Sequence, residues 1–327
     1  MIAYVLRSLA QAVLVLLAVA LLAFSMFRFV GDPVSNLVGQ EATQEDRREL
    51  AERLGLNDPI WLQFARFVGN AAQFEFGISY RHGRRVSALI AEKLPATVEL
   101  AVLSVLFATS AGIAFGVYTA IRRSGWLTHF IMTASLIGVS LPTFLIGIGL
   151  IYLFAVELRW LPSFGRGETV KIGWWTTGLL TGSGRKSLIL PVLTLGFFQL
   201  TLIMRLVRAQ MLEVLRTDYV KFARARGVPE NRIHFKHALR NTLIPVVTIV
   251  GLQFGSVIAF AIVTESVFQW PGLGALFVQA VQFVDIPVMA AYLLFVAVVF
   301  VVVNLIVDFL YFVLDPRLRI GRLAVQK

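Results

Sequence analysis

The sequence predicts an all-α, polytopic membrane protein with six transmembrane helices and with both termini in the cytoplasm. Hydrophobic residues make up 57% of the 327 residues, and charged residues only 15%. Soluble domains carry about 25% charged residues, so the chain has too little polar surface for a water-soluble domain of its size. In addition, six runs without Asp, Glu, Lys or Arg come close to or exceed the ~20 residues that a helix needs to cross a bilayer.

These uncharged runs define the expected spans. The first follows the basic residue Arg7, as a signal peptide would. It is longer than the usual core of about 7–15 apolar residues, and no small-x-small cleavage site ends it before Arg28, so we expect an anchor that stays. The fourth run is short, and the long side chain of Arg205 extends it to the interface. In chain order the runs are Ser8–Phe27, Leu100–Ile121, Phe130–Val156, Leu188–Met204, Leu243–Thr264 and Ile286–Val307.

The distribution of charge sets the expected orientation. With the N-terminus inside, six spans place Arg122, Arg123, the stretch Arg205–Asn241 and the tail Asp315–Lys327 in the cytoplasm. That side then holds 16 of the 30 Lys and Arg but only 5 of the 19 Asp and Glu. Eight of the remaining cations lie in the long segment Gly31–Leu94, which carries little weight in the positive-inside rule.

The spans divide the chain into four parts. Within the external part, we expect a charge-rich helix at Glu41–Leu54 and an aromatic packing face at Trp61, Phe64 and Phe67, which recur every three residues. With no cysteine and so few residues, this part is expected to pack on the membrane portion rather than stand alone. The parts are the N-terminus with the first span (1–30), the external segment (31–95), the membrane core of spans two to six (96–313) with a cytoplasmic loop (208–241), and a cytoplasmic tail (314–327).

Small residues and prolines pattern the spans. Gly112 and Gly116, and likewise Gly251 and Gly255, are four residues apart, a spacing that lets two helices approach closely. We therefore expect these glycines to form helix-packing faces. Prolines predict bends in or at the ends of spans three to six, at Pro142, Pro191, Pro245 and Pro287.

The chain lacks the residues that several classes of function require. The string Gly178-x3-Gly182-x-Gly184-Arg185-Lys186-Ser187 does not match a phosphate-binding loop, so any ATP hydrolysis is expected on another chain. No charged pair lies within a span, which disfavours a secondary carrier with a proton or sodium relay. His234 and His237 are three apart on an expected helix, but no third ligand is placed beside them, so we expect no metal site and no cofactor in this chain.

The cytoplasmic stretch Arg205–Asn241 is the most informative part of the chain. Asp218 begins an amphipathic helix that Gly227 ends as a left-handed cap, and Pro229 prevents its continuation. A second short helix is expected at Glu230–Arg240. On composition alone, this stretch is equally compatible with a basic segment bound to anionic lipid.

The order of residues in this loop is more specific. From Asp218 the loop reads DYVKFARARG, and from His237 it reads HALRNTLIP. It resembles the permease subunits of ABC importers of the dipeptide, oligopeptide and nickel branch, whose loop reads Asp/Glu-Tyr-Val-x-x-Ala-Arg-Ala-Lys-Gly and then His-Ala-Leu-Arg-Asn-x-x-Ile-Pro. Lys221, Phe222, His237 and Arg240 depart from the general ABC importer loop, but these departures are the variant seen in this branch. The positions that match the branch are Asp218, Tyr219, Val220, Ala223, Arg224, Ala225, Gly227, His237, Ala238, Leu239, Arg240, Asn241, Ile244 and Pro245.

Three further stretches resemble the same branch, so the resemblance covers essentially the whole chain. It is nearest to the first of the two permeases of a dipeptide system, because of the long external segment after the first span. The stretches are Gly77, Ser79, Val86, Ile90, Leu94, Pro95, Thr97 and Leu100; then Glu265, Phe268, Pro271, Gly272, Leu273, Gly274, Asp285 and Pro287; and finally the tail that begins at Asp315 and Pro316.

The resemblance implies a type I ABC importer permease fold in the bacterial inner membrane. It implies half of a translocation pathway for dipeptides or oligopeptides, assembled with a second permease, two ATPase subunits that bind ATP and Mg, an external solute-binding protein and membrane lipid, but not nucleic acid. An importer of nickel chelates or glutathione, and an ATP-independent carrier or channel, are the alternatives.

The resemblance also implies roles for particular residues. Glu265 and Asp285 could meet the peptide or the binding protein, although solvated charges are the more ordinary interpretation. The loop helix would fit a groove on an ATPase subunit through Asp218, Tyr219, Val220, Phe222, Ala223, Arg224, Arg226 and Gly227. The external loop comprises Glu265, Phe268, Pro271, Gly272, Gly274 and Asp285. Uncharged polar residues within the spans could line the path or bond a neighbouring helix: Ser140, Gln199, Gln253 and Ser256, and also Ser135, Thr143, Thr201 and Asn304.

Overall fold

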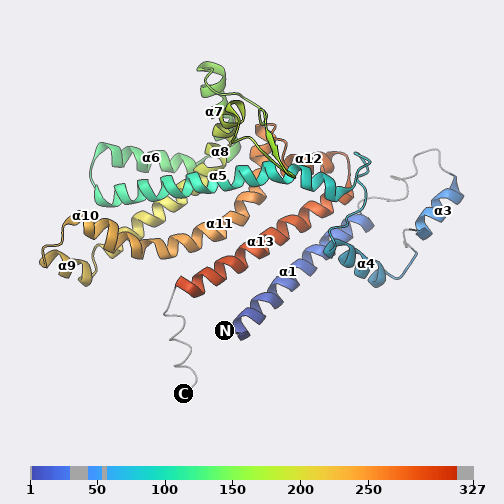
Figure 1. Ribbon diagram of the computed structural model, residues 1–327, viewed down its shortest axis with the longest axis horizontal. Helices are drawn as coiled ribbons and strands as arrows, with labels where there is room; N and C mark the ends of the chain where they lie inside the picture. Colours follow the sequence, from blue (N-terminus) through green and yellow to red (C-terminus); the bar gives the residue numbers. More distant parts are fainter. Residues whose placement is uncertain (1, 30–42, 54–56, 315–327) are drawn as a thin grey trace.

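The computed structural model describes residues 2–29, 43–53 and 57–314, and the predicted tail from Asp315 lies outside these ranges. Within them the chain is a bundle of long helices (Figure 1). Five helices are long and apolar enough to cross a membrane. They are α1 (Ile2–Phe29), α5 (Val86–Ile121), α8 (Gly182–Val214), α11 (Leu239–Val267) and α13 (Ile286–Leu314).

The third predicted span is not one straight helix. The run Phe130–Val156 falls on α6 (Trp126–Ser140) and on α7 (Thr143–Ile151) with its π-helical continuation η1 (Tyr152–Glu157). The two halves are bent by 114° at Pro142, where the sequence predicted a bend. Leu141 is extended, because the ring of Pro142 disfavours helical backbone in the residue before it. Taken together as one span, the bent pair brings the number of spans to the predicted six.

Shorter elements connect the long helices. They are α3 (Gln44–Arg53), α4 (Ile60–Ala72), β1 (Val170–Ile172), β2 (Trp175–Thr177), α9 (Asp218–Ala225), α10 (Glu230–Arg232), η2 (Ile233–Ala238) and α12 (Leu273–Gln282). The strands β1 and β2 form an antiparallel hairpin in which Val170 pairs with Thr177 and Ile172 with Trp175. The second predicted loop helix, Glu230–Arg240, has no end of its own, because α10 and the π-helical η2 lead directly into α11.

Helices α5 and α8 pack against each other at the centre of the bundle. A Cβ atom on Gly112 would lie 2.9 Å from Ile203 Cγ2, and one on Gly116 would lie 2.6 Å from Val207 Cβ. Separations this short show that the glycines let the backbones approach closely. The predicted packing role is therefore confirmed for this pair, and Gly251 and Gly255 meet α13 in the same way.

The external segment packs partly on the first span, as expected. Phe64 and Phe67 of α4 form edge-on and tilted ring contacts with Phe24 of α1, with centroids 5.6 and 5.9 Å apart. Phe67 also meets Phe27. Trp61 does not join them, since its side chain is largely exposed. Two of the three predicted aromatic residues thus form the packing face.

The molecule has two distinct ends. In Figure 1, α9 and α10 lie at the left end together with the turn between α5 and α6. Helix α12, helix α4 and the first turn of α5 lie toward the opposite, right end. We call this right end the outer end, in keeping with the predicted orientation.

Candidate functional site

The helix α9 is a short element with a well-defined end. Asp218 stands in its first turn and Arg224 in its last, which suits the helix dipole at both ends. Gly227 has a φ of +76°, a left-handed conformation that favours glycine. The N–H of Gly227 donates to Arg224 O at 2.9 Å, and that of Val228 donates to Ala223 O at 3.1 Å. This is the Schellman arrangement, so the predicted glycine cap is confirmed.

One face of α9 is buried in the chain's own core. Val220 is fully buried in a cluster with Met211, Leu215, Ile233 and Ala238. The expectation that Val220 contacts an ATPase subunit is therefore wrong, because its side chain fixes α9 to α8 and η2. Ala223, which is partly buried, packs against the same cluster.

The opposite face of α9 is exposed. The exposed fraction of Phe222 is 63%, and that of Tyr219 is 43%. The guanidinium carbon of Arg226 lies 5.5 Å from the centre of the Phe222 ring, within the range of a cation–π contact. We call Tyr219, Phe222 and Arg226 the coupling surface. Two exposed aromatic rings beside a cation are typical of protein–protein contacts.

Polar contacts tie α9 to the helix that follows. Arg224 donates to Glu230 twice, from Nε at 2.7 Å and from Nη2 at 3.1 Å, and His234 Nε2 lies 3.2 Å from the same carboxylate. The hydrogen bond from Arg224 holds the pKa of Glu230 below its usual value. Asn241 Nδ2 also donates to the Tyr219 hydroxyl at 2.7 Å. These contacts hold α9 in one orientation on the α10–η2–α11 helix.

The two external carboxylates are buried. Glu265 is 0% exposed and Asp285 is 1% exposed, so the expectation that they are solvated charges is wrong. Glu265 accepts hydrogen bonds from Thr97 Oγ1 at 2.6 Å and from the N–H of Ala275 at 3.0 Å. Thr97 Oγ1 in turn accepts from the N–H of Leu273 at 2.8 Å. Together these groups satisfy the free N–H groups at the start of α12.

Asp285 fastens a second external element. It accepts hydrogen bonds from the hydroxyl of Ser79 and from the N–H groups of Tyr80 at 3.2 Å and Arg81 at 3.4 Å. The loop 77–85 is thereby held against the turn between α12 and α13. Of the other external loop residues, Pro271 is exposed, while Phe268, Gly272 and Gly274 are buried.

A buried ion pair escaped the sequence analysis. Arg166 Nη2 lies 2.5 Å from Glu99 Oε2, and the side chains are only 8% and 3% exposed. Glu99 also accepts hydrogen bonds from Thr177 Oγ1 at 2.6 Å and from the N–H of Gly178 at 3.0 Å. Glu99 directly precedes the uncharged run from Leu100, so the sequence placed it outside. Its partner is 67 residues away along the chain, and no spacing signals such a pair.

The predicted path residues do not share one environment. Gln199 is buried, and its Oε1 has no hydrogen-bond partner among the described residues. Ser140 is exposed at the break between α6 and α7, and Gln253 and Ser256 are half-buried on α11. Ser135 and Thr201 donate to carbonyl groups of their own helices, and Thr143 and Asn304 are half-buried. The role of these residues in a path stays a prediction.

Two family models match the chain. Residues 112–320 match the binding-protein-dependent transport system inner membrane component, and residues 1–101 match the N-terminal part of such components. The chain is 37% identical to the dipeptide transport system permease protein DppB of Alkalihalophilus pseudofirmus, over 98% of this chain and 100% of the relative. It is 39% identical to the di/tripeptide permease protein DppB of Pseudomonas aeruginosa, over 98% and 99%. It is 38% identical to the glutathione permease protein GsiC of Shigella flexneri, again over 98% and 99%.

A solved structure supports the fold. The inward-facing MetNI methionine ABC transporter superposes with a TM-score of 0.55 at 17% identity, covering 69% of this chain and 96% of that chain. The type I ABC importer permease fold is thereby confirmed. The chain belongs to the inner membrane components of binding-protein-dependent transport systems, in the branch of the dipeptide and oligopeptide ABC permeases.

Proposed function

We propose that this chain is a permease subunit of an ATP-driven importer of short peptides and forms half of its translocation pathway. The full-length match to peptide permeases supports this proposal. The observation that carries it is the coupling surface. A membrane component that does not hydrolyse ATP itself needs a rigid surface outside the bilayer to which an ATPase can bind, and α9 presents two exposed aromatic rings on such a surface.

The energy would come from a partner. ATPase subunits that hold ATP and Mg would bind α9, and nucleotide binding would favour one conformation of the membrane-spanning helices. The helix α10–η2–α11 begins beside α9 and ends at Val267, and Glu265 in its last turn caps α12. A displacement of α9 would therefore reach the outer end along one continuous helix. A second permease would supply the other half of the path, and an external solute-binding protein would deliver the cargo.

The proposed cargo is a dipeptide or a longer oligopeptide. The relatives are named for dipeptides, for di- and tripeptides, for oligopeptides and for glutathione, which is itself a tripeptide. Uncharged polar side chains such as Gln253 and Ser256 could hydrogen-bond a passing peptide backbone without trapping it. Nickel chelates share none of this backbone chemistry and are the second candidate cargo.

The test is to purify the tagged chain from native membranes in mild detergent and to identify its partners by mass spectrometry. We expect a second six-span protein and two ATPase subunits. The complex is then placed in liposomes with the external binding protein, and the uptake of labelled dipeptide, glutathione and nickel chelate is compared. ATP-dependent uptake of a peptide is the expected result. A chain that purifies alone and transports without ATP would instead be a secondary carrier.

A further inference from the structure

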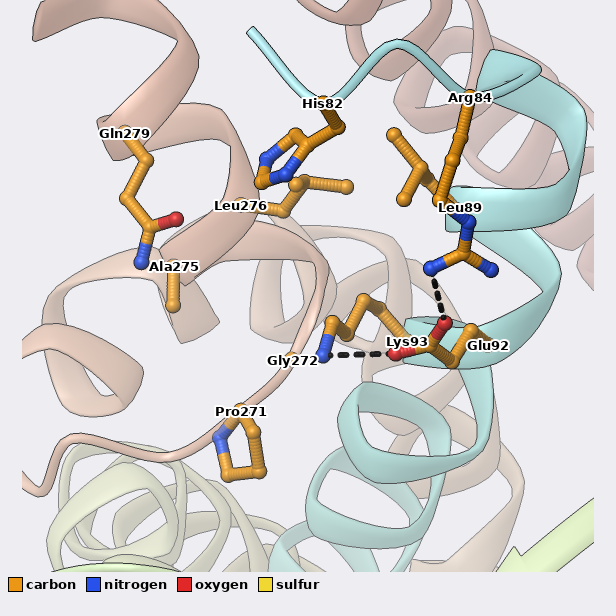
Figure 2. Close-up of a pocket in the computed structure, with 10 residues that line it drawn as sticks. All are labelled: His82, Arg84, Leu89, Glu92, Lys93, Pro271, Gly272, Ala275, Leu276 and Gln279. Atoms are coloured by element: carbon orange, nitrogen blue, oxygen red, sulfur yellow. Dashed lines mark hydrogen bonds and ion pairs between the residues drawn. The ribbon is translucent and has the colours of Figure 1, made fainter. Parts of the chain in front are cut away.

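A small cavity at the outer end lies between the start of α5 and α12. Its volume is about 200 Å³, and its walls include His82, Arg84, Glu92, Lys93 and Gln279. Figure 2 shows Gly272 and Pro271 along its lower edge, with His82 and Gln279 on one side and Arg84 and Lys93 on the other. We call this cavity the outer pocket. None of its side chains belongs to the coupling surface.

The charges in the outer pocket are unbalanced. Arg84 Nη1 and Lys93 Nζ each lie 3.0 Å from a different oxygen of Glu92, as Figure 2 shows. One carboxylate is thus shared by two permanent cations, and His82 adds a further donor. All three members of this chain of charges remain partly exposed. The pocket therefore favours a second carboxylate.

The walls of the outer pocket are fixed before anything binds. In the loop 77–85, the N–H of Ser79 donates to Arg84 O at 2.9 Å, and the left-handed Gly83 closes the turn. Asp285 anchors this loop, and Glu265 anchors the start of α12. A surface that needs no ordering on association loses less conformational entropy when it binds. This rigidity favours a docking role over a merely solvated cluster of charges.

The size of the outer pocket selects the kind of occupant. Sites for small molecules usually measure about 300–1,000 Å³, so about 200 Å³ is too small to enclose a peptide cargo. It has room for one acidic side chain. We propose that the outer pocket receives an Asp or Glu side chain of the external solute-binding protein when that protein docks on the permease. This inference rests on the proposed function, because it names the surface through which that partner engages.

The test uses the complete transporter in lipid nanodiscs and the solute-binding protein loaded with a dipeptide. Stimulation of ATP hydrolysis is measured against the concentration of the binding protein. Lys93→Gln removes a cation from the pocket and should raise the half-saturating concentration about three- to tenfold. Glu92→Gln removes the competing carboxylate and should lower it. Lys171→Gln, on the exposed strand β1, makes the same charge change elsewhere and should leave it unchanged.

The two variants are expected to change the half-saturating concentration in opposite directions. Damage to the fold would instead raise it in both variants, so the experiment distinguishes a docking role from a structural one. The proposal is overturned if Lys93→Gln and Glu92→Gln both behave as wild type, or if both raise the half-saturating concentration. It is also overturned if the variants change the half-saturating concentration of free peptide instead. A wild-type transporter that no binding protein stimulates would refute the proposed function itself, so the two failures are distinguishable.

Discussion

At the residue scale, Gly227 has a left-handed backbone conformation but open space around it, so the effect of backbone strain can be tested there without steric crowding. Its φ is +76°, yet a Cβ atom placed on it would meet nothing within 4 Å. An uncharged substitution there therefore acts through the backbone conformation and not through steric crowding. The left-handed conformation costs an ordinary residue about 1–2 kcal/mol, whereas Asn adopts it more readily.

Gly227→Pro should abolish transport while leaving membrane insertion intact. Proline cannot adopt a positive φ, and it removes the N–H that donates to Arg224 O. The end of α9 should therefore unravel. Gly227→Asp should lose transport as well, because it places a negative charge at the C-terminal end of α9, where the helix dipole disfavours it. Gly227→Asn, the neutral matched control, should keep most of it. Uptake in liposomes is the measurement, with the amount of membrane-inserted chain as the reference, and wild-type uptake by the proline variant would contradict the prediction.

The buried pair of Glu99 and Arg166 gives a second prediction at this scale. Glu99→Gln leaves the Arg166 guanidinium buried without its counter-charge, which should cost about 3–5 kcal/mol. The apparent midpoint of thermal unfolding in detergent should fall sharply. Glu92→Gln on the same helix is the control, because its ion pairs are exposed and contribute less than about 1 kcal/mol. Equal midpoints for the two variants would show that the buried pair is not structural.

At the element scale, the helices follow the sequence closely where burial and periodicity act together. The six apolar runs, the glycine faces and the cap at Gly227 depend on local chemistry, so the sequence alone was sufficient to predict them. The bend between α6 and α7 was predicted at Pro142, but its angle of 114° was not, because a proline signals a break and not the size of the bend. Glu265 and Asp285 were misassigned as solvated, because their partners Thr97 and Ser79 lie 168 and 206 residues away.

The contact between α11 and α13 supplies a prediction about packing. A Cβ atom on Gly251 would collide with Cγ2 of Val307, whereas the Cβ of Val307 would lie 3.4 Å away. Gly251→Ala should therefore destabilise the chain by about 1–3 kcal/mol. Val307→Ala removes the colliding methyl group, so the double variant should recover stability relative to Gly251→Ala.

The control for this pair is Gly149→Ala in α7, where a new Cβ meets nothing within 4 Å. It should be neutral or slightly stabilising, because alanine favours helix more than glycine does. Thermal unfolding of the four variants in one detergent is the measurement. Additive effects of Gly251→Ala and Val307→Ala would contradict the collision.

At the scale of the whole molecule, the two ends are joined by rigid elements rather than by loops. The continuous helix α10–η2–α11 starts at the contacts with α9 and ends beside the start of α12 (Figure 1). The only departure from α-helix along it is η2, a π-helical turn of the kind that is frequent at functional sites. Under the proposed function, a displacement of the coupling surface would be carried to the outer pocket along this helix and through the carboxylate of Glu265.

The coupling surface itself yields the last prediction, which concerns assembly. Phe222→Ala should weaken recovery of the ATPase subunits about tenfold, because an aromatic side chain at the centre of an interface often contributes ~1–2 kcal/mol or more. The stability of the isolated chain should not change, since Phe222 is 63% exposed. Phe74→Ala is the matched control: Phe74 is 68% exposed but follows α4, at the outer end. Val220→Ala should show the reverse pattern, with lower stability of the chain itself, because Val220 fills the core beneath α9. Quantitative co-purification and thermal unfolding of the three variants separate these effects. Equal recovery of ATPase by Phe222→Ala and Phe74→Ala would show that α9 does not contact the ATPase subunits.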